Sequence, residues 1–499
     1  MNSVIIVSPN SKSLYQGLAS RWAAIEPNMY ALLLAGGVRA KGFHPIYLDL
    51  EAYPPIDEKD LISKFEQYNC PLIVFSAQGQ NPNFSSMVFK SCVETATTLK
   101  NYHPEWKIYV TGPHVNAVPQ SVLERHKCFD GLIFNEGVYS LCNLLRNNGN
   151  PEGIKGIWWS KNGRIETNPP EGLVPQELFT QDMPGPALDL IEDFSKYRTS
   201  DWHANFIAED RSPFSSCITS LGCPFTCSFC QINIQNRDSN ELNRSAKDFN
   251  TFRFWDANQS IKQFEYLASR GVRIIKITDE MFLLKERHYM PLIDLLIERK
   301  LGQSYWAYAR IDSVKPKVLE KLKKAGVDWL ALGIEGGSES VRKNVTKGKF
   351  DNDDIYSIVK MIEDAGISTG LNYIVGLPGD TWETMTQTLC MGLELNGYNH
   401  NIYANTKLPG SPEYLEYTMD GGELPEDYSE FAFLGYNHIP AHTNTLSSAE
   451  ILSFRDYAWH ALFENPAYHA KIRAKFGEAA VSTVKEMCKV KLKRKILGD

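Results

Sequence analysis

The sequence lacks the features of several protein classes. None of its apolar runs reaches the ~18 residues of a membrane-spanning helix, and no basic-then-apolar signal segment opens it. Positive charge is not in excess, because 52 Lys and Arg stand against 59 Asp and Glu, so general nucleic-acid binding is not indicated. Only ten of 499 residues are cysteine, and most are scattered, which fits a reducing compartment better than a disulfide framework. We therefore expect a cytoplasmic protein without a transmembrane segment.

The first third of the chain has the pattern of a doubly wound α/β domain. Short apolar, β-branched runs alternate with helix-length segments, which is typical of a parallel sheet covered on both faces. No G-x-G-x-x-G motif is present, so a dinucleotide is disfavoured. The strands are expected at residues 4–7, 45–50, 72–75, 108–110 and 131–134. The helices are expected at residues 29–41, 58–68, 86–102, 120–126 and 138–147.

The length and composition of the chain predict more than one domain. At 499 residues the chain is too long for one ordinary core. A hairpin with an Asn162-Gly163 turn and a Pro-rich connector follow the first domain. The aromatic residue Trp202 is interpreted there as packing or surface, and a place in the roof of a site between the domains is the alternative. We expect a Rossmann-like domain, a linker, a second α/β domain and a mostly helical C-terminal region, over residues 1–150, 151–210, 211–410 and 411–499.

Three of the ten cysteines lie together in one loop. Cys223, Cys227 and Cys230 are separated by three and then two residues, so their thiolates can converge on one metal centre, and sulfur ligands favour iron–sulfur clusters or zinc. A closed zinc site needs four ligands, and His203 and Cys217 are poorly spaced for the fourth. A ferredoxin run has a fourth cysteine that is absent here. Zinc binding and plain electron transfer stay open as alternatives.

The spacing C-x3-C-x2-C, with Phe229 before the last cysteine, resembles the signature of the radical S-adenosylmethionine (SAM) enzymes. The resemblance implies a [4Fe–4S] cluster on Cys223, Cys227 and Cys230, which would be both metal ligands and catalytic residues. It also implies that the open iron of the cluster binds the amino and carboxylate groups of SAM. Electron transfer would then cleave SAM to a 5′-deoxyadenosyl radical.

A second βα series begins near residue 216. Its six units match the partial (β/α)6 TIM-type barrel of radical SAM enzymes, which places chemistry at the carboxyl ends of the strands. Charged and small residues follow the expected strands at 273–278, 305–309, 329–333 and 369–375. The resemblance implies that Asp279 or Glu280 faces the methionine amino group, Arg310 the carboxylate or substrate, Glu335 the ribose, and Val375-Gly376 the adenine. For a single carboxylate, a solvated loop charge or a helix cap is the alternative.

The strand ends of the first domain carry small and polar residues that let a bulky ligand approach the backbone. T-G-P-H and N-E-G resemble the cobalamin-binding domain of the B12-dependent radical SAM subfamily, which implies a corrin across this edge of the sheet. The motif D-x-H-x-x-G is absent from this domain, so we expect cobalt without a protein histidine ligand. Ordinary βα turns are the alternative. The residues implied in corrin binding are Ser76, Ala77, Thr111, Gly112, Pro113, Glu136 and Gly137.

The C-terminal region is expected to cap the barrel. It contains a loop-rich aromatic stretch, in which Tyr428, Phe431, Phe433 and Tyr436 are interpreted as core residues or as the lining of a substrate pocket. Helices are expected at residues 448–464 and 466–476. Residues 485–495 form a basic amphipathic tail, for which a solvated helix is the main interpretation. Contact of that tail with an anionic substrate or a membrane surface is the alternative.

The main hypothesis is a cobalamin-dependent radical SAM methyltransferase, a class B-like enzyme that acts on an unactivated carbon of a biosynthetic intermediate. A non-methylating cyclisation or rearrangement is the second hypothesis, and an iron–sulfur electron-transfer or metal-binding protein is the third. The expected partners are a small-molecule substrate and an external electron donor such as flavodoxin or ferredoxin. No motif identifies the substrate.

Overall fold

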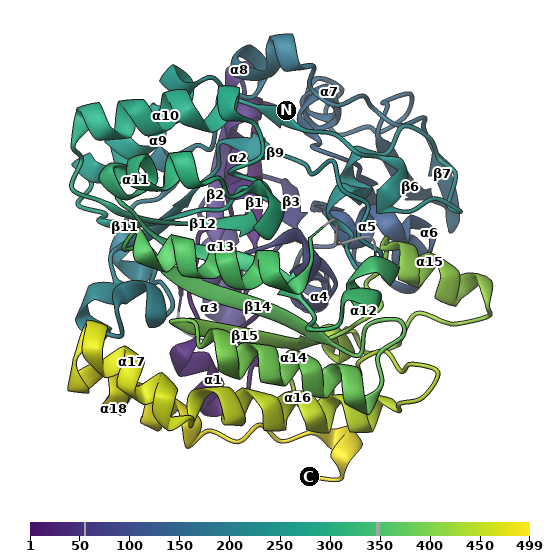
Figure 1. Ribbon diagram of the computed structural model, residues 1–499. Helices are drawn as coiled ribbons and strands as arrows, with labels where there is room; N and C mark the ends of the chain where they lie inside the picture. The colour runs from purple at the N-terminus through teal and green to yellow at the C-terminus, as the bar shows by residue number, and fades with distance from the viewer. Residues whose placement is uncertain (54–55, 346–349) are drawn as a thin grey trace.

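The computed structural model describes residues 1–53, 56–345 and 350–499, without the side chains of residues 18–20. Two sheets organise the molecule, and helices and loops from the C-terminal region join them (Figure 1). Within the described residues, no helix is long and apolar enough to cross a membrane.

The first sheet has seven strands in the order β2-β1-β3-β4-β5-β6-β7. The first five pair in parallel in the flavodoxin-like order, as expected from the sequence. The hairpin that we placed in the linker adds two antiparallel strands to this sheet, because β6 pairs with β5. The strands are β1 (Ser3–Ser8), β2 (His44–Asp49), β3 (Leu72–Ser76), β4 (Lys107–Thr111), β5 (Gly131–Ile133), β6 (Ile157–Lys161) and β7 (Arg164–Thr167).

Helices cover both faces of this sheet because its strands are apolar on both sides. Val4 and Ile6 of β1 face a core that includes α2 (Met29–Ala40) and α7 (Val138–Arg146). Ile5 and Val7 face the opposite core. That second core contains α3 (Glu58–Glu66), α4 (Ser85–Tyr102) and α6 (Pro119–Arg125).

The second sheet is the expected partial barrel of six parallel strands, in the order β15-β14-β13-β12-β11-β8. Its helices lie outside it (Figure 1). The strands are β8 (Phe214–Cys217), β11 (Ile274–Ile277), β12 (Ser304–Arg310), β13 (Val327–Glu335), β14 (Ser368–Val375) and β15 (Asn399–Ala404). The helices are α9 (Ala257–Ser269), α10 (Glu286–Arg299), α11 (Pro316–Ala325), α12 (Glu339–Asn344), α13 (Asn352–Asp364) and α14 (Trp382–Leu395).

The C-terminal region contacts both domains. The α15 helix (Pro412–Met419) and the 3-10 turn η12 (Tyr428–Phe431) pack on the first domain, whereas α16 (Ser448–Phe463) packs on β15. α17 (Pro466–Phe476) and α18 (Glu478–Cys488) follow. The expected helix over residues 485–495 is wrong beyond Cys488, where the chain is irregular before a short 3-10 turn at Lys495–Leu497. Buried Arg494 accounts for this, because it donates hydrogen bonds to Asp456 and to the Phe433 carbonyl and so ties the tail to the body.

Candidate functional site

The three clustered cysteines open into one cavity at the carboxyl ends of the barrel strands. Cys223, Cys227 and Cys230 all line this space of about 1400 Å³, which we call the cluster cavity. β12, β13, β14 and β15 supply the facing wall. Its lining there includes Arg310, Glu335, Ile374, Asn372, Asn401, Tyr403 and Asn405.

Side chains from three parts of the chain hold the cysteine loop. The Asn233 side chain accepts a hydrogen bond from the Cys223 N–H at 3.2 Å and donates one to the Cys223 carbonyl at 2.6 Å. Glu413 of α15 accepts a 2.6 Å hydrogen bond from Ser228. Asn83 of the first domain lies 3.9 Å from Cys230 Sγ. These contacts tie the loop to the barrel domain, to α15 and to the first domain.

The arrangement favours a cluster over a single zinc ion. No three described His, Cys, Asp or Glu side chains are grouped so that they could hold one metal ion. Structural zinc needs four ligands on one ion. In a four-iron cluster each cysteine binds a different iron, so three thiols that line one cavity can serve it without a fourth ligand on the same ion.

Arg310 is a buried cation beside the cysteine loop. It pairs with Asp312 at 2.8 Å, and its guanidinium lies 3.8 Å from the centre of the Phe225 ring. Burial opposes the charge, but the Asp312 carboxylate raises the pKa of Arg310, with Cys227 and Cys223 contributing. Its NH1 atom is buried and has no hydrogen-bond partner among the described residues. A ligand carboxylate in the cavity could occupy that position.

Glu335 ends β13 in a strained backbone conformation. Its φ is +69°, and the pairing with β14 shifts register between Gly333 and Glu335. Non-glycine residues rarely adopt this left-handed region, and such strain gathers at functional sites. The irregular strand end brings the buried Glu335 to the lining of the cluster cavity.

The neighbouring carboxylates of Asp279 and Glu280 have different surroundings in the structure. Asp279 is fully buried and accepts hydrogen bonds at 2.6 Å from the Thr219 N–H, the Thr219 hydroxyl and the Ser220 hydroxyl. It ties β11 to the connection after β8 and is not among the residues that line the described cavities. Of these two neighbours, Glu280 lines the cluster cavity and Asp279 does not.

The two residues expected beside the adenine lie next to the cluster cavity in sequence but not on its lining. Val375 is fully buried, and a side chain at Gly376 would collide with Ile451 of α16. Neither is among the residues that line the cluster cavity, whereas their neighbour Ile374 is.

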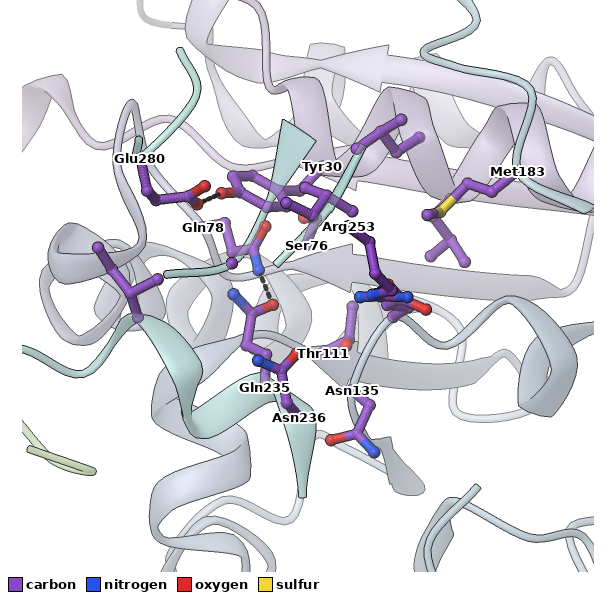
Figure 2. Close-up of a pocket in the computed structure, with 16 residues that line it drawn as sticks. Tyr30, Ser76, Gln78, Thr111, Asn135, Met183, Gln235, Asn236, Arg253 and Glu280 are labelled. Carbon is purple, nitrogen blue, oxygen red and sulfur yellow. Dashed lines mark hydrogen bonds and ion pairs between the residues drawn. The ribbon is translucent and has the colours of Figure 1, made fainter. Parts of the chain in front are cut away.

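A second cavity of about 600 Å³, the interdomain cavity, lies between the first sheet and the barrel domain. Figure 2 shows polar side chains from both domains meeting there: Tyr30 of α2 donates a hydrogen bond to Glu280, and Gln78 donates one to Gln235. Of the residues implied in corrin binding, it is lined by Ser76, Thr111 and Glu136. Glu136 is already paired with Arg253.

The other four implied residues lie beside this cavity rather than on its lining. Gly112, at φ +135°, is required by close backbone packing, since a Cβ there would lie 2.5 Å from the Ala77 carbonyl oxygen. Pro113 and Gly137 begin or cap helices α5 (Pro113–Ala117) and α7. These residues shape the backbone at the strand ends.

The chemistry of the interdomain cavity fits a corrin. Amide and hydroxyl groups of Ser76, Gln78, Thr111, Asn135 and Gln235 line it, and they complement the amide side arms of cobalamin. Gln78 Oε1 and Glu280 Oε2 are buried there without a hydrogen-bond partner in the described chain. No histidine is among the described residues that line it.

The two cavities are adjacent. Ile232 and Glu280 line both of them, so Glu280 stands where the cluster cavity meets the interdomain cavity. Burial raises the pKa of Glu280 to about 7, although the Tyr30 hydrogen bond opposes this.

Sequence reasoning missed residues that no motif marks. Tyr30, Asn83 and Gln235 reach the cavities from helices and turns, and only the packing of two domains brings them there. Trp202, for which packing is the main interpretation and a place in the roof of the site the alternative, lines the cluster cavity. Among the C-terminal aromatics, Phe433 lines the same cavity, Tyr428 and Phe431 are core residues, and Tyr436 is exposed.

Comparison with known proteins agrees with this geometry. Residues 16–145 match the B12 binding domain, and residues 217–389 match the radical SAM superfamily. The chain is 25% identical over 322 residues to an uncharacterized methyltransferase of Pyrococcus horikoshii, covering 63% of this chain and 64% of that protein. It is 21% identical over 446 residues to the anaerobic magnesium-protoporphyrin IX monomethyl ester cyclase of Rubrivivax gelatinosus. That match covers 87% of this chain and 72% of the cyclase.

The fold also matches solved structures. The radical SAM methyltransferase TsrM of Kitasatospora setae has a TM-score of 0.67 at 16% identity, with 98% of this chain and 99% of that chain covered. A radical SAM domain implies a [4Fe–4S] cluster and SAM, and a B12-binding domain implies cobalamin. The domain order, the cysteine loop and the two adjacent cavities lead to one assignment: the chain belongs to the cobalamin-dependent radical SAM enzymes.

Proposed function

We propose that this protein is a methyltransferase that acts on an unactivated carbon of a small-molecule intermediate. The observation that carries the proposal is the junction at Glu280 and Ile232, where the amide-lined interdomain cavity meets the cluster cavity. Methyl transfer to an unactivated carbon needs the methyl carrier and the radical site to face the same substrate. Adjacent cavities with a shared wall meet that need.

The cysteine loop would hold the cluster in the barrel mouth. Cys223, Cys227 and Cys230 supply three thiolates, with Asn233 and Asn83 fixing the loop on either side. When bound, the [4Fe–4S] cluster and cobalamin supply an electron for the reductive cleavage of SAM and a carrier for its methyl group. The protein's part is to hold these groups in line in a space with little water.

The barrel strand ends would position SAM. The free NH1 of Arg310 is placed for its carboxylate, because a guanidinium binds carboxylates through well-aligned hydrogen bonds. Glu335 would accept hydrogen bonds from the ribose hydroxyls, and Ile374 would pack against the adenine. Phe225 would keep the guanidinium in place from the loop side.

Glu280 would hold a proton at the junction. Its pKa of about 7 lets its carboxyl exist in either form near neutral pH, and Tyr30 donates a hydrogen bond to one of its oxygens. The second oxygen is free to contact the SAM amino group or the corrin edge. General acid–base groups work best with a pKa near the working pH.

The test uses protein reconstituted anaerobically with iron and sulfide, then with hydroxocobalamin, and desalted. With SAM and a strong reductant, we expect 5′-deoxyadenosine, and S-adenosylhomocysteine only when the corrin is present. The Cys227→Ala variant should keep the corrin and lose 5′-deoxyadenosine, whereas Cys390→Ala, an exposed cysteine of α14, should behave as wild type. Full 5′-deoxyadenosine formation by Cys227→Ala would contradict the cluster assignment.

A cyclisation without methyl transfer is the second candidate, and the match to a protein named as a cyclase favours it. The same experiment separates the two, because a cyclase would form 5′-deoxyadenosine without corrin-dependent S-adenosylhomocysteine. An intact cluster with neither product would point instead to an electron-transfer protein. A flavodoxin or ferredoxin is the proposed physiological electron donor in either enzymatic case.

A further inference from the structure

Glu335, which lines the cluster cavity at the end of β13, is the central residue of a γ-turn. The Gly336 N–H donates a 3.0 Å hydrogen bond to the Ile334 carbonyl, and the φ of Glu335 is +69°. A positive φ at the centre of a γ-turn marks its rare and strained form. Such strain persists only where the surrounding structure holds the residue in place. The contacts around this turn therefore decide where the Glu335 carboxylate lies.

Arg342 of α12 is the first anchor of the turn. Its NH1 donates a buried 2.6 Å hydrogen bond to the Gly336 carbonyl, and its NH2 donates a 2.8 Å hydrogen bond to Asn352 of α13. The side chain is fully buried, and its guanidinium lies 5.6 Å from the centre of the Phe350 ring. Burial lowers the pKa of Arg342. Because a charged donor forms stronger hydrogen bonds than a neutral one, Arg342 holds the carbonyl firmly.

Thr388 of α14 is the second anchor. Its buried hydroxyl accepts a 2.9 Å hydrogen bond from the Gly337 N–H and donates one of 3.1 Å to the Thr384 carbonyl, one helical turn earlier. The α14 backbone packs closely here, since a Cβ on Gly337 would lie 2.5 Å from the Gln387 carbonyl oxygen. The position of α14 therefore fixes the Gly337 N–H.

The two anchors bind opposite ends of one peptide group. The carbonyl that Arg342 contacts and the N–H that Thr388 contacts both belong to the peptide bond between Gly336 and Gly337. A peptide group is planar, so fixing both ends fixes its orientation and limits rotation of the residue before it. Helices that follow two different strands thus converge on the turn.

We propose that Arg342 and Thr388 are positioning residues that hold the Glu335 carboxylate at the cluster cavity for SAM. Neither is among the described residues that line this cavity, so they act through Glu335 rather than by contact with the ligand. This inference rests on the proposed function for the contact of Glu335 with the ribose hydroxyls. A carboxylate that is already held in its binding position costs less to order when the ligand arrives. Without its anchors, the strained turn would relax, and SAM binding would include the cost of restoring it.

The test is equilibrium dialysis of SAM against cluster-reconstituted protein. Thr388→Val keeps the shape of the side chain and removes the acceptor, so SAM should bind about threefold more weakly or worse, as for the loss of one hydrogen bond. Arg342→Leu should weaken binding about tenfold, because a charged donor is lost. Arg342→Lys, which keeps a charged donor, should recover part of that loss. The control is Thr386→Val, whose exposed hydroxyl donates to the Trp382 carbonyl of its own helix, and it should bind SAM as wild type does.

Coupling to Glu335 separates positioning from a general loss of structure. In the Glu335→Ala background, Thr388→Val and Arg342→Leu should weaken SAM binding no further, because the group that they position is absent. Weakening by the same factor in both backgrounds would overturn the inference. At saturating SAM, the single variants should form 5′-deoxyadenosine with a wild-type kcat and a raised KM for SAM, as expected when only binding is changed.

Wild-type SAM affinity in both Thr388→Val and Arg342→Leu would also overturn the inference. If the leucine variant does not fold, the isosteric valine variant alone decides the test. Dialysis of SAM needs neither corrin nor methyl transfer, so a failed methyl-transfer assay leaves this result intact. Conversely, absent coupling removes the role of the two anchors, whereas the methylated product is judged by its own assay.

Discussion

His114 is buried within a cluster of rings that joins the first domain to the C-terminal region. Its ring stacks on Phe89 at 4.4 Å, meets Tyr428 at 5.0 Å and lies 3.0 Å from the Ser86 hydroxyl. Burial, with nearby His126 and Arg125, lowers the pKa of His114 to about 3. This histidine of the T-G-P-H string therefore contributes to packing, and it faces rings rather than the interdomain cavity.

The buried neutral ring predicts a loss of stability in acid. The unfolded chain takes up a proton near the ordinary value of 6.5, whereas the folded chain resists it down to about pH 3. Stability is therefore complete above about pH 6.5 and falls as the pH drops towards 3, by up to about 1.4 kcal/mol per pH unit for this group. We expect His114→Gln to flatten the fall in melting temperature between pH 6.5 and 5.

The control for that measurement is Phe89→Leu, a change in the same cluster that removes no titrating group. It should lower the melting temperature at every pH by a similar amount and leave the slope as in wild type. An unchanged slope in His114→Gln would show that other groups account for the acid sensitivity.

Single residues also show what the sequence could and could not predict. The spacing of Cys223, Cys227 and Cys230 is local, so the loop was identifiable without a structure. Asp279 and Glu280 are adjacent in sequence and differ only in what surrounds them, so a motif could not separate the buried anchor from the cavity residue. Asn83 approaches Cys230 across 147 positions of sequence, and no local pattern encodes such a contact.

At the scale of elements, strand positions followed from apolar periodicity, but strand endings did not. β13 ends in a register shift that places Glu335 at φ +69°. The conformation costs a non-glycine residue about 1–2 kcal/mol, which the flanking strands must offset. The apolar pattern predicts where β13 runs, whereas this irregularity, which positions the carboxylate, depends on pairing with β14.

The backbone strain at Glu335 lowers the stability of the fold, and the same conformation places the carboxylate for ligand binding. Glu335→Gly should be more stable than Glu335→Ala by about 1 kcal/mol, because both lose the same carboxylate and only glycine accepts the backbone conformation freely. Both variants should bind SAM about tenfold more weakly, as expected for the loss of a hydrogen bond to a charged group. Denaturant midpoints and equilibrium dialysis of SAM measure the two effects. Equal stability of the two variants would contradict strain at this position, and wild-type SAM affinity in both would remove Glu335 from the site.

At the scale of the whole molecule, a buried ion pair joins the two domains. Glu26, in the loop before α2, reaches Lys276 of β11 at 2.9 Å and accepts a 3.1 Å hydrogen bond from Ser216 of β8. Both side chains of the pair are more than nine-tenths buried. Burial opposes the charge of Lys276, but Glu26 raises its pKa, and the Trp306 ring lies 5.0 Å from its ammonium. The order of the domains follows from the sequence, whereas their relative position depends on contacts of this kind.

This pair predicts strong coupling between residues 250 positions apart. Glu26→Gln leaves a buried ammonium without its partner charge, and Lys276→Met leaves a buried carboxylate. Each should lower the free energy of unfolding by about 3–5 kcal/mol, the usual cost of breaking a buried ion pair. The double variant should lose clearly less than the sum of the two, since neither charge then remains stranded. Urea unfolding of the four proteins, followed by tryptophan fluorescence, measures the coupling. Additive losses would show that the pair does not join the domains energetically, and the interface would then depend on the Tyr30–Glu280 and Gln78–Gln235 hydrogen bonds around the interdomain cavity.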